Sequence, residues 1–203
     1  MRRKGARRRR RTFMDLRERV LEVAREAIEV KRRFFEGELE GVLEAARLLV
    51  GTLRGGGKVL IFGNGGSAAQ AQHIAAELVN RFRKDRKGLP ALALTTDTSV
   101  LTSVANDYDF SLVFARQIEA LGEAGDLAWG MTTSGRSPNV VKALQVAKQR
   151  GLRTLAFSGG DGGQVKEVAE LCLVVPSEET PRIQEVHITL AHILCELAED
   201  ELF

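Results

Sequence analysis

The fold is decided by residues 58–67, which read KVLIFGNGGS. Lys58–Phe62 is a short apolar run, which predicts a buried β-strand. The turn Gly63–Ser67 follows it directly and opens a stretch with helical periodicity that extends to about Phe82. A strand followed through a glycine turn by a helix is the repeating element of an α/β protein.

The alternation of short apolar strands and helices continues to the end of the chain. Four more strands are predicted, at residues 91–95, 127–131, 154–157 and 171–175. The predicted helices lie at residues 99–106, 111–121, 138–150, 164–169 and 181–201. Strands that are apolar on both faces imply a parallel sheet between two layers of helices. The predicted fold class is α/β, a three-layer sandwich with a five-stranded parallel sheet.

Two amphipathic helices are expected before the sheet, between Met14 and Leu53, with a break near Glu36–Gly37. Residues 1–12 hold eight basic and no acidic side chains, and without them 22 basic residues face 27 acidic ones. A basic arm of this kind is either a nucleic-acid-binding tail or a disordered extension, and we favour the extension for residues 1–13. Residues 14–203 are expected to form a single domain.

The composition, 44% hydrophobic and 28% charged, is that of an ordinary soluble protein. No apolar run approaches the roughly 20 residues that span a bilayer, and no secretory signal is recognisable. The two cysteines, Cys172 and Cys195, do not make a disulfide framework. Together these features indicate a cytoplasmic protein.

Binding sites in parallel α/β folds lie at the carboxyl ends of the strands. Three predicted strands end there in turns rich in glycine, serine or threonine, at residues 63–67, 132–137 and 158–163. The first turn lacks the third glycine of a dinucleotide fingerprint and the lysine of a Walker loop. It offers a helix N-terminus whose amides and dipole favour an anion, although many such turns contain glycine merely to turn.

The second turn is the more informative one, because four hydroxyl side chains surround Gly135. They belong to Thr132, Thr133, Ser134 and Ser137. A simple helix cap at Ser137, followed by Pro138, explains one of the four hydroxyls. We therefore interpret this turn as a phosphate site.

Histidine is scarce, and its three copies fall in two predicted helices, His73 in one and His187 and His192 in the other. His73 and Glu77 are four residues apart, so they project from one helix face and can share a proton or a divalent ion. Alone, such a pair is most simply a solvated surface pair. The second histidine cluster favours a functional site.

These segments resemble the SIS domain, a flavodoxin-like sugar isomerase fold, and within it the phosphoheptose isomerases. The resemblance covers Met14 to the C-terminus and is carried by residues 62–67, 72–78, 106–107, 133–135 and, most specifically, 182–187. It implies conversion of D-sedoheptulose 7-phosphate to D-glycero-D-manno-heptose 7-phosphate through an enediol, the first step towards nucleotide-activated heptose. It also implies a homotetramer with sites near the subunit interfaces.

The resemblance further implies roles for individual residues. Zinc would be bound by His73, Glu77, Gln184 and His192, and Glu77 and His192 would also be the catalytic acid/base pair. Substrate contacts would be made by Asn64, Gly65, Gly66, Glu77, Asn106, Asp107, Thr132, Thr133, Ser134, Ser137 and Gln184. One position departs from the family, because Gln70 stands where an aspartate is usual.

Helical geometry limits how the residues of the last helix can act together. Gln184 and His192 lie roughly 80° apart around the helix and about 12 Å apart along it. Both side chains would have to stretch to reach one ion, unless different subunits contribute. His187 lies roughly 140° from His192, which gives it a supporting or substrate-contacting role.

A second hypothesis is a non-catalytic SIS regulator that binds a partner protein such as a replication initiator. Such a regulator does not need acid/base residues, whereas this chain carries both Glu77 and His192. We therefore favour the enzyme. A phosphosugar is the expected ligand, and neither nucleic acid nor a membrane is an expected partner.

Overall fold

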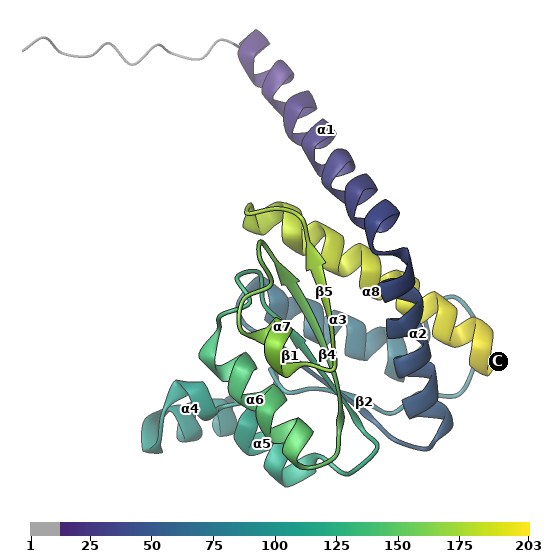
Figure 1. Ribbon diagram of the computed structural model, residues 1–203, viewed down its shortest axis with the longest axis vertical. Coiled ribbons are helices and arrows are strands. Elements are labelled where there is room, and N and C mark those ends of the chain that lie inside the picture. Colours follow the sequence, from purple (N-terminus) through teal and green to yellow (C-terminus); the bar gives the residue numbers. More distant parts are fainter. Residues whose placement is uncertain (1–12) are drawn as a thin grey trace, which may run out of the picture.

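Five strands form one parallel sheet in the computed structural model, which describes residues 13–203 (Figure 1). They are β1 (Val59–Gly63), β2 (Ala91–Ala93), β3 (Leu127–Met131), β4 (Arg153–Gly159) and β5 (Leu171–Val175). Their order is β2-β1-β3-β4-β5, and every neighbouring pair is parallel. The predicted sheet is confirmed, and its strand order is that of flavodoxin-like folds. The order reverses between β1 and β3, and ligands bind such folds beside the carboxyl ends of strands at this point.

Helices cover both faces of the sheet. One layer consists of α2 (Leu39–Arg54), α3 (Gly66–Val79) and α8 (Thr180–Leu202). The other consists of α4 (Thr98–Asp107), α5 (Ala115–Leu121), α6 (Pro138–Gln149) and α7 (Val165–Val168). Each layer packs on its own hydrophobic cluster, because successive strand residues point to opposite faces.

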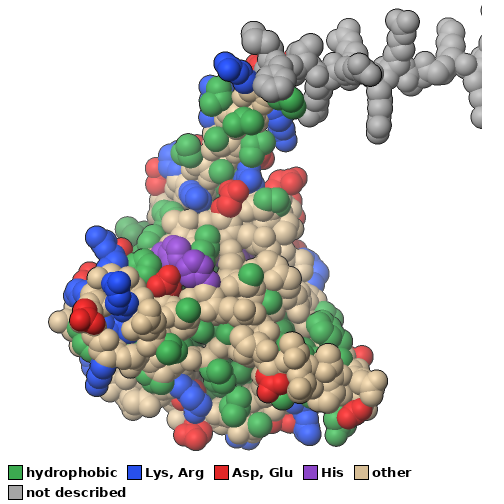
Figure 2. All heavy atoms as spheres, turned by 180° about the vertical axis from the view of Figure 1, so that it is seen from behind, with side chains coloured by type: hydrophobic (Ala, Val, Ile, Leu, Met, Phe, Trp, Pro, Cys, Tyr) green, Lys and Arg blue, Asp and Glu red, His purple; other side chains and the backbone are tan. Residues whose placement is uncertain are grey.

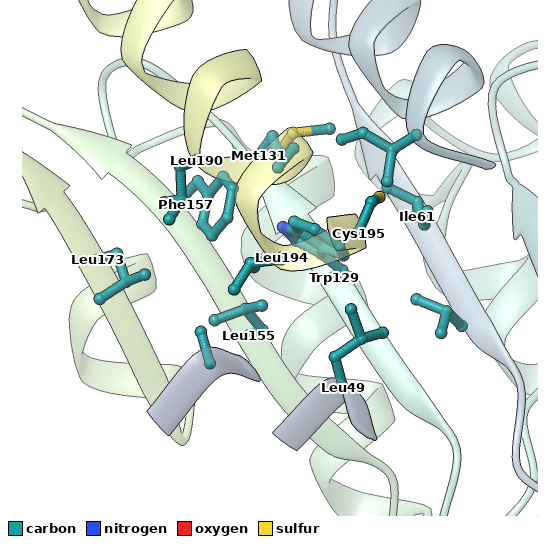
Figure 3. Close-up of a cluster of buried hydrophobic side chains, with 14 of the residues drawn as sticks. Leu49, Ile61, Trp129, Met131, Leu155, Phe157, Leu173, Leu190, Leu194 and Cys195 are labelled. Carbon is teal, nitrogen blue, oxygen red and sulfur yellow. The ribbon is translucent and has the colours of Figure 1, made fainter. Parts of the chain in front are cut away.

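The cluster beneath α8 contains the largest buried side chain. Trp129 of β3 and Phe157 of β4 pack edge to face, with ring centroids 5.0 Å apart. Figure 3 shows these two rings together with Leu190 and Leu194 of α8. This core fixes the position of α8 against the sheet, and with it the position of every side chain on the outer face of α8.

The N-terminal helices are α1 (Phe13–Gly37) and α2, separated by a bend at Glu38, next to the predicted break. Val30 and Phe34, in the second half of α1, are buried, whereas Leu16 and Val20 in its first half are exposed. Figure 1 shows the first turns of α1 standing away from the sheet. Residues 1–12 of the predicted basic extension lie outside the described residues.

The end of α3 differs from the prediction and matters for the site. The sequence pattern predicts a helix to Phe82, but α3 ends at Val79, and a segment without helix or strand leads to β2. The helix ends there because its last carbonyl groups bind other partners. The N–H of Leu89 and the guanidinium of Arg86 both donate to the carbonyl oxygen of Leu78.

The other predicted elements are present with shifted boundaries. The helix predicted at residues 111–121 is divided into a 3₁₀ turn (Phe110–Leu112), capped by the Asp109 carboxylate, and α5. The strand predicted at residues 154–157 extends from Arg153 to Gly159. Among the helices of the described part of the chain, none has both the length and the apolar character of a membrane span.

Candidate active site

Three side chains from two helices meet on the α3–α8 layer. His73 and Glu77 lie on α3, and His192 lies on α8. His73 Nε2 is 3.0 Å from Glu77 Oε1, as the four-residue spacing predicts, and 3.2 Å from His192 Nε2. Figure 2 shows histidine atoms on the surface of this side of the molecule, bordered by acidic and hydrophobic side chains. We call these three residues the histidine site.

The packing of α3 beside α8 in the same direction creates the histidine site. Near the two helix starts, Gln70 Nε2 donates to the carbonyl oxygen of Gln184 at 2.8 Å. Further along both helices, His73 meets His192. Beyond the end of α3, the Glu199 carboxylate accepts hydrogen bonds from the backbone. The approach of His73 to His192 therefore follows from tertiary packing, not from spacing within either helix.

His192 is held between two rings and partly shielded from water. Its ring centroid lies 5.1 Å from that of His73 and 5.4 Å from that of Phe82, whose ring is inclined to it by 26°. Partial burial lowers the pKa of His192, and the charge of His73 lowers it further, while Glu77 acts in the opposite direction. A neutral imidazole can accept a proton or bind a metal ion.

The geometry of the histidine site fits a metal ion. One ligand atom from each of the three side chains can be chosen so that all lie within 4.8 Å of one another. Two nitrogen donors and one carboxylate oxygen are a set that zinc accepts in catalytic sites. Two ligands of a tetrahedral zinc ion lie roughly 3.3 Å apart, which is close to the 3.0 and 3.2 Å that separate His73 Nε2 from Glu77 and His192. The donor set and its spacing therefore suit zinc.

Gln184 lies beside the glycine turn at the start of α3. A Cβ atom at Gly66 would come within 2.5 Å of Gln184 Nε2, so the carboxamide packs directly on this glycine. Gly66 and His73 are seven residues apart on α3, which is about two helical turns or roughly 10 Å. Within one chain, the fourth predicted zinc ligand thus packs beside the glycine turn at the start of α3.

Two asparagines link the turns at the reversal of strand order. Asn64, directly after β1, and Asn139, in the first turn of α6, exchange two side-chain hydrogen bonds of 2.9 and 2.8 Å. Asn64 is a predicted substrate contact, whereas sequence reasoning missed Asn139. The available signal was its place next to Pro138 at a helix start, beside the hydroxyl-rich turn.

The hydroxyls of turn 132–137 are arranged differently from a simple helix cap. Ser137 is the N-cap residue of α6, but its hydroxyl lies 2.9 Å from Thr132 Oγ1. Ser134 is exposed, and its hydroxyl accepts a hydrogen bond from the N–H of Arg136. The Arg136 side chain pairs with Asp161 at 2.5 Å. The turn therefore presents hydroxyls and the N-terminus of α6 at the carboxyl edge of the sheet.

Gly135 fixes the path of this turn. Its φ of +67° and its approach to the third turn exclude a side chain, because a Cβ atom would come within 2.1 Å of the carbonyl oxygen of Gly162. Ser158 at the end of β4 donates to the same carbonyl oxygen at 3.1 Å. The second and third glycine-containing turns are therefore packed backbone against backbone.

His187 occupies the core rather than the surface. Its side chain is fully buried, and its Nε2 lies 3.1 Å from the carbonyl oxygen of Ser158. Burial lowers the pKa of His187 to about 4, so its ring is neutral. The contact with Ser158 agrees with the supporting role expected for His187. Because the side chain is fully buried, His187 cannot contact a substrate.

Asn106 and Asp107 lie in the other layer of helices. They end α4, are exposed, and hydrogen-bond to each other at 2.9 Å. The sheet separates the α4 layer from α3 and α8. Within one chain, the structure thus brings together the residues of the histidine site and, separately, the turns at the carboxyl edge of the sheet. Asn106 and Asp107 lie apart from the histidine site.

Comparison with known proteins shows the family of this chain. The SIS domain family matches residues 23–159. A phosphoheptose isomerase from Thermodesulfovibrio yellowstonii is 53% identical over 94% of this chain and 94% of its own length, and one from Aquifex aeolicus is 54% identical over 90% and 96%. The solved phosphoheptose isomerase from Neisseria gonorrhoeae is 42% identical, covers 91% of this chain and 99% of its own, and superposes with a TM-score of 0.86. The chain therefore belongs to the phosphoheptose isomerase family of SIS-domain proteins.

Proposed function

We propose that this chain converts D-sedoheptulose 7-phosphate to D-glycero-D-manno-heptose 7-phosphate, the first step towards nucleotide-activated heptose. The observation that carries the proposal is the convergence of the Glu77 carboxylate with the imidazoles of His73 and His192. Aldose–ketose isomerisation needs such groups to move protons between two adjacent carbons and their oxygens. The similarity to phosphoheptose isomerases over most of the chain supports the same reaction.

The hydroxyl-rich turn at residues 132–137 and the histidine site are two separate polar regions, and their separation suits the two ends of this substrate. The hydroxyl-rich turn and the start of α6 would hold the phosphate, through Thr132, Thr133, Ser134 and Ser137. The histidine site lies about two helical turns along α3 from the glycine turn and would receive the reacting carbons. Asn64, Gly65, Gly66 and Gln184 would contact the sugar between them. Asn106 and Asp107 would contact substrate bound by a neighbouring subunit.

Glu77 and His192 would act as the acid/base pair. One of them takes a proton from C1 of the ketose, which leaves an enediolate across C1 and C2 with its charge on the oxygen of C2. The proton is then delivered to C2, while the proton of the C1 hydroxyl is transferred to the oxygen on C2. No atom is gained or lost, and the product is the aldose. Each such proton transfer contributes about 10²–10⁴-fold to the rate of a reaction of this kind.

We extend the proposal to zinc, held by His73, Glu77 and His192, with Gln184 as the fourth ligand. Because Gln184 packs beside Gly66 within its own chain, this fourth ligand would come from another subunit. When bound, zinc would polarise the oxygens on the two reacting carbons. Metal analysis of the purified protein should give about one zinc per chain, because each chain supplies one set of these ligands. A His73→Ala variant that retains the parent's zinc content would exclude His73 as a ligand.

The test of the function is direct turnover. Purified full-length protein should convert D-sedoheptulose 7-phosphate to the aldoheptose 7-phosphate, as followed by NMR, and Glu77→Gln should lose the activity. Glu119→Gln is a matched control, because Glu119 is an exposed helical glutamate paired with Arg116 on α5. A parent protein that leaves the ketose unchanged, with zinc supplied, would contradict the proposal and favour the regulator.

The proposal includes a homotetramer in the cytoplasm, with residues 14–203 as one domain. Exposed apolar side chains along α1, including Leu16, Val20, Leu21 and Ile28, support assembly, because they would be covered by other subunits. Sedimentation at micromolar concentration should show the tetramer. A monomer would contradict it. Deletion of residues 1–13 should leave turnover unchanged.

A further inference from the structure

The segment after α3 is held by a carboxylate that does not belong to the histidine site. Glu199 of α8 accepts hydrogen bonds from the backbone N–H groups of Phe82, Arg83 and Lys84, at 2.8, 2.8 and 2.9 Å. Its partner Arg86 donates from Nε to the same carboxylate at 2.9 Å. The side chains of Glu199 and Arg86 are each only 2% exposed.

Arg86 also holds the end of α3. Its guanidinium donates to the carbonyl oxygens of Glu77 and Leu78, at 2.9 and 2.7 Å, and to that of Asn80 at 3.3 Å. These carbonyls lie in or just after the last turn of the helix, where backbone acceptors lack partners within the helix. Because Glu77 is a member of the histidine site, Arg86 fixes the backbone that carries one of its three side chains.

The same network places an aromatic ring on His192. Phe82 is the first residue whose N–H binds Glu199, and its ring stacks on the His192 imidazole with centroids 5.4 Å apart. His73 lies on His192 as well, with centroids 5.1 Å apart. The orientation of His192 is thus restricted by Phe82, and the position of Phe82 by Glu199.

We propose that Glu199, Arg86 and Phe82 are positioning residues of the histidine site, with the buried ion pair holding Phe82 against His192 and Arg86 holding the turn that carries Glu77. The inference rests on the proposed isomerase and its zinc. Outer partners that orient metal ligands typically contribute 10–100-fold to metal affinity or activity. The network is held in its charged form. Burial opposes ionisation of Glu199, but the three backbone N–H groups and Arg86 outweigh it and lower its pKa to about 2.

The chain offers a matched control for a purely structural role. Asp126 is also a buried carboxylate that holds a loop, accepting from the N–H groups of Lys58 and Glu123 at 2.9 and 2.8 Å and pairing with Lys58 Nζ at 2.7 Å. It precedes β3 and therefore lies at the amino end of the sheet. Asp126→Asn should destabilise the fold without changing the histidine site.

The experiment compares Glu199→Gln, Phe82→Leu, Phe82→Tyr and Asp126→Asn with the parent. Thermal unfolding, zinc affinity by competition with a chelator, kcat and KM are measured for each protein. We expect Glu199→Gln and Phe82→Leu to weaken zinc binding and lower kcat by about tenfold or more, with KM little changed. Phe82→Tyr, which keeps the ring, should retain both properties, and so should Asp126→Asn despite its lower melting temperature.

Unchanged zinc affinity and kcat in Phe82→Leu would overturn the inference. Because Phe82→Leu retains the Glu199–Arg86 network, it tests the inference even if Glu199→Gln does not fold. An equal loss in Asp126→Asn would also overturn it, because general destabilisation would then explain the effect. Failure of the proposed function is distinguishable. In that case the parent itself does not isomerise the substrate, but the zinc affinities of the variants can still be compared with that of the parent.

Discussion

The two polar regions of this molecule are built in opposite ways. The turns at the carboxyl edge of the sheet owe their shape to backbone conformation, with Gly135 at positive φ and packed against Gly162. The histidine site consists of side chains on two rigid helices, brought together by the core beneath α8. The first region is suited to surrounding a phosphate with amides and hydroxyls, and the second to holding acid/base groups at fixed distances. Substitutions in the first region should therefore change mainly KM, and substitutions in the second should change mainly kcat.

The largest effect is expected in the histidine site. Glu77→Gln or His192→Ala should lower kcat by about 10³-fold, because each removes a group that can transfer a proton. KM should change much less, since the hydroxyl-rich turn that would hold the phosphate is intact. Steady-state kinetics with Glu119→Gln as the control measure this effect. Either variant turning over at the parent rate would remove that residue from the chemistry.

A smaller and different effect is expected in the hydroxyl-rich turn at residues 132–137. Ser134→Ala removes one hydroxyl that would bind the phosphate, and a hydrogen bond to a charged group is worth about 1.5–3 kcal/mol. KM should therefore rise about tenfold or more while kcat at saturation stays near the parent value. A drop in kcat comparable with that of Glu77→Gln would mean that the two regions do not divide the work in this way.

The contrast also explains how much could be predicted from the sequence. The apolar strand at 59–63 and its successors indicate the parallel sheet, because their pattern is local. The four-residue spacing likewise predicts the contact of His73 with Glu77. The approach of His192 depends on how α3 packs beside α8, and the chain segments involved are more than 100 residues apart. Without the family resemblance, residue spacing alone could not predict that His192 lies beside His73.

The residues missed by sequence reasoning share this cause. Phe82 was predicted as the last residue of a helix, but Arg86 and Leu89 end α3 earlier, and the freed segment places Phe82 on His192. Asn139 contacts Asn64 across two turns that meet only when β1 and β3 pair. Both contacts arise from tertiary structure, which local periodicity does not encode.

His187, the buried histidine of α8, supports the fold and lies outside the histidine site, and the pH dependence of stability tests this role. The pKa of His187 is lowered by burial to about 4, below the ordinary value of 6.5. The unfolded chain therefore takes up the proton first, so stability is fully present above about pH 6.5 and is lost as the pH falls towards 4. From pH 7.5 to 5.5 the parent should lose about 1 kcal/mol more than His187→Gln in urea unfolding. Parallel losses in the two proteins would show that His187 does not resist protonation.

The smallest effect is expected at Gln70, where the two regions adjoin. Gln70→Ala removes the hydrogen bond to the Gln184 carbonyl and should cost about 1 kcal/mol of stability. Turnover should stay close to that of the parent, because Gln70 cannot carry a proton as the family's usual aspartate can. Gln72→Ala, an exposed glutamine on the same helix, is the control. A tenfold loss of kcat would instead give Gln70 a part in the reaction.

The most direct test of the division between the two regions is the incorporation of solvent deuterium at C2 of the aldose during turnover in D₂O. The parent should incorporate deuterium, because the enediol is protonated by a group that exchanges with solvent. Ser134→Ala should still do so at saturating substrate, whereas Glu77→Gln and His192→Ala should lose the exchange. Exchange that survives in both histidine-site variants, or that is lost equally in Ser134→Ala at saturation, would contradict the account.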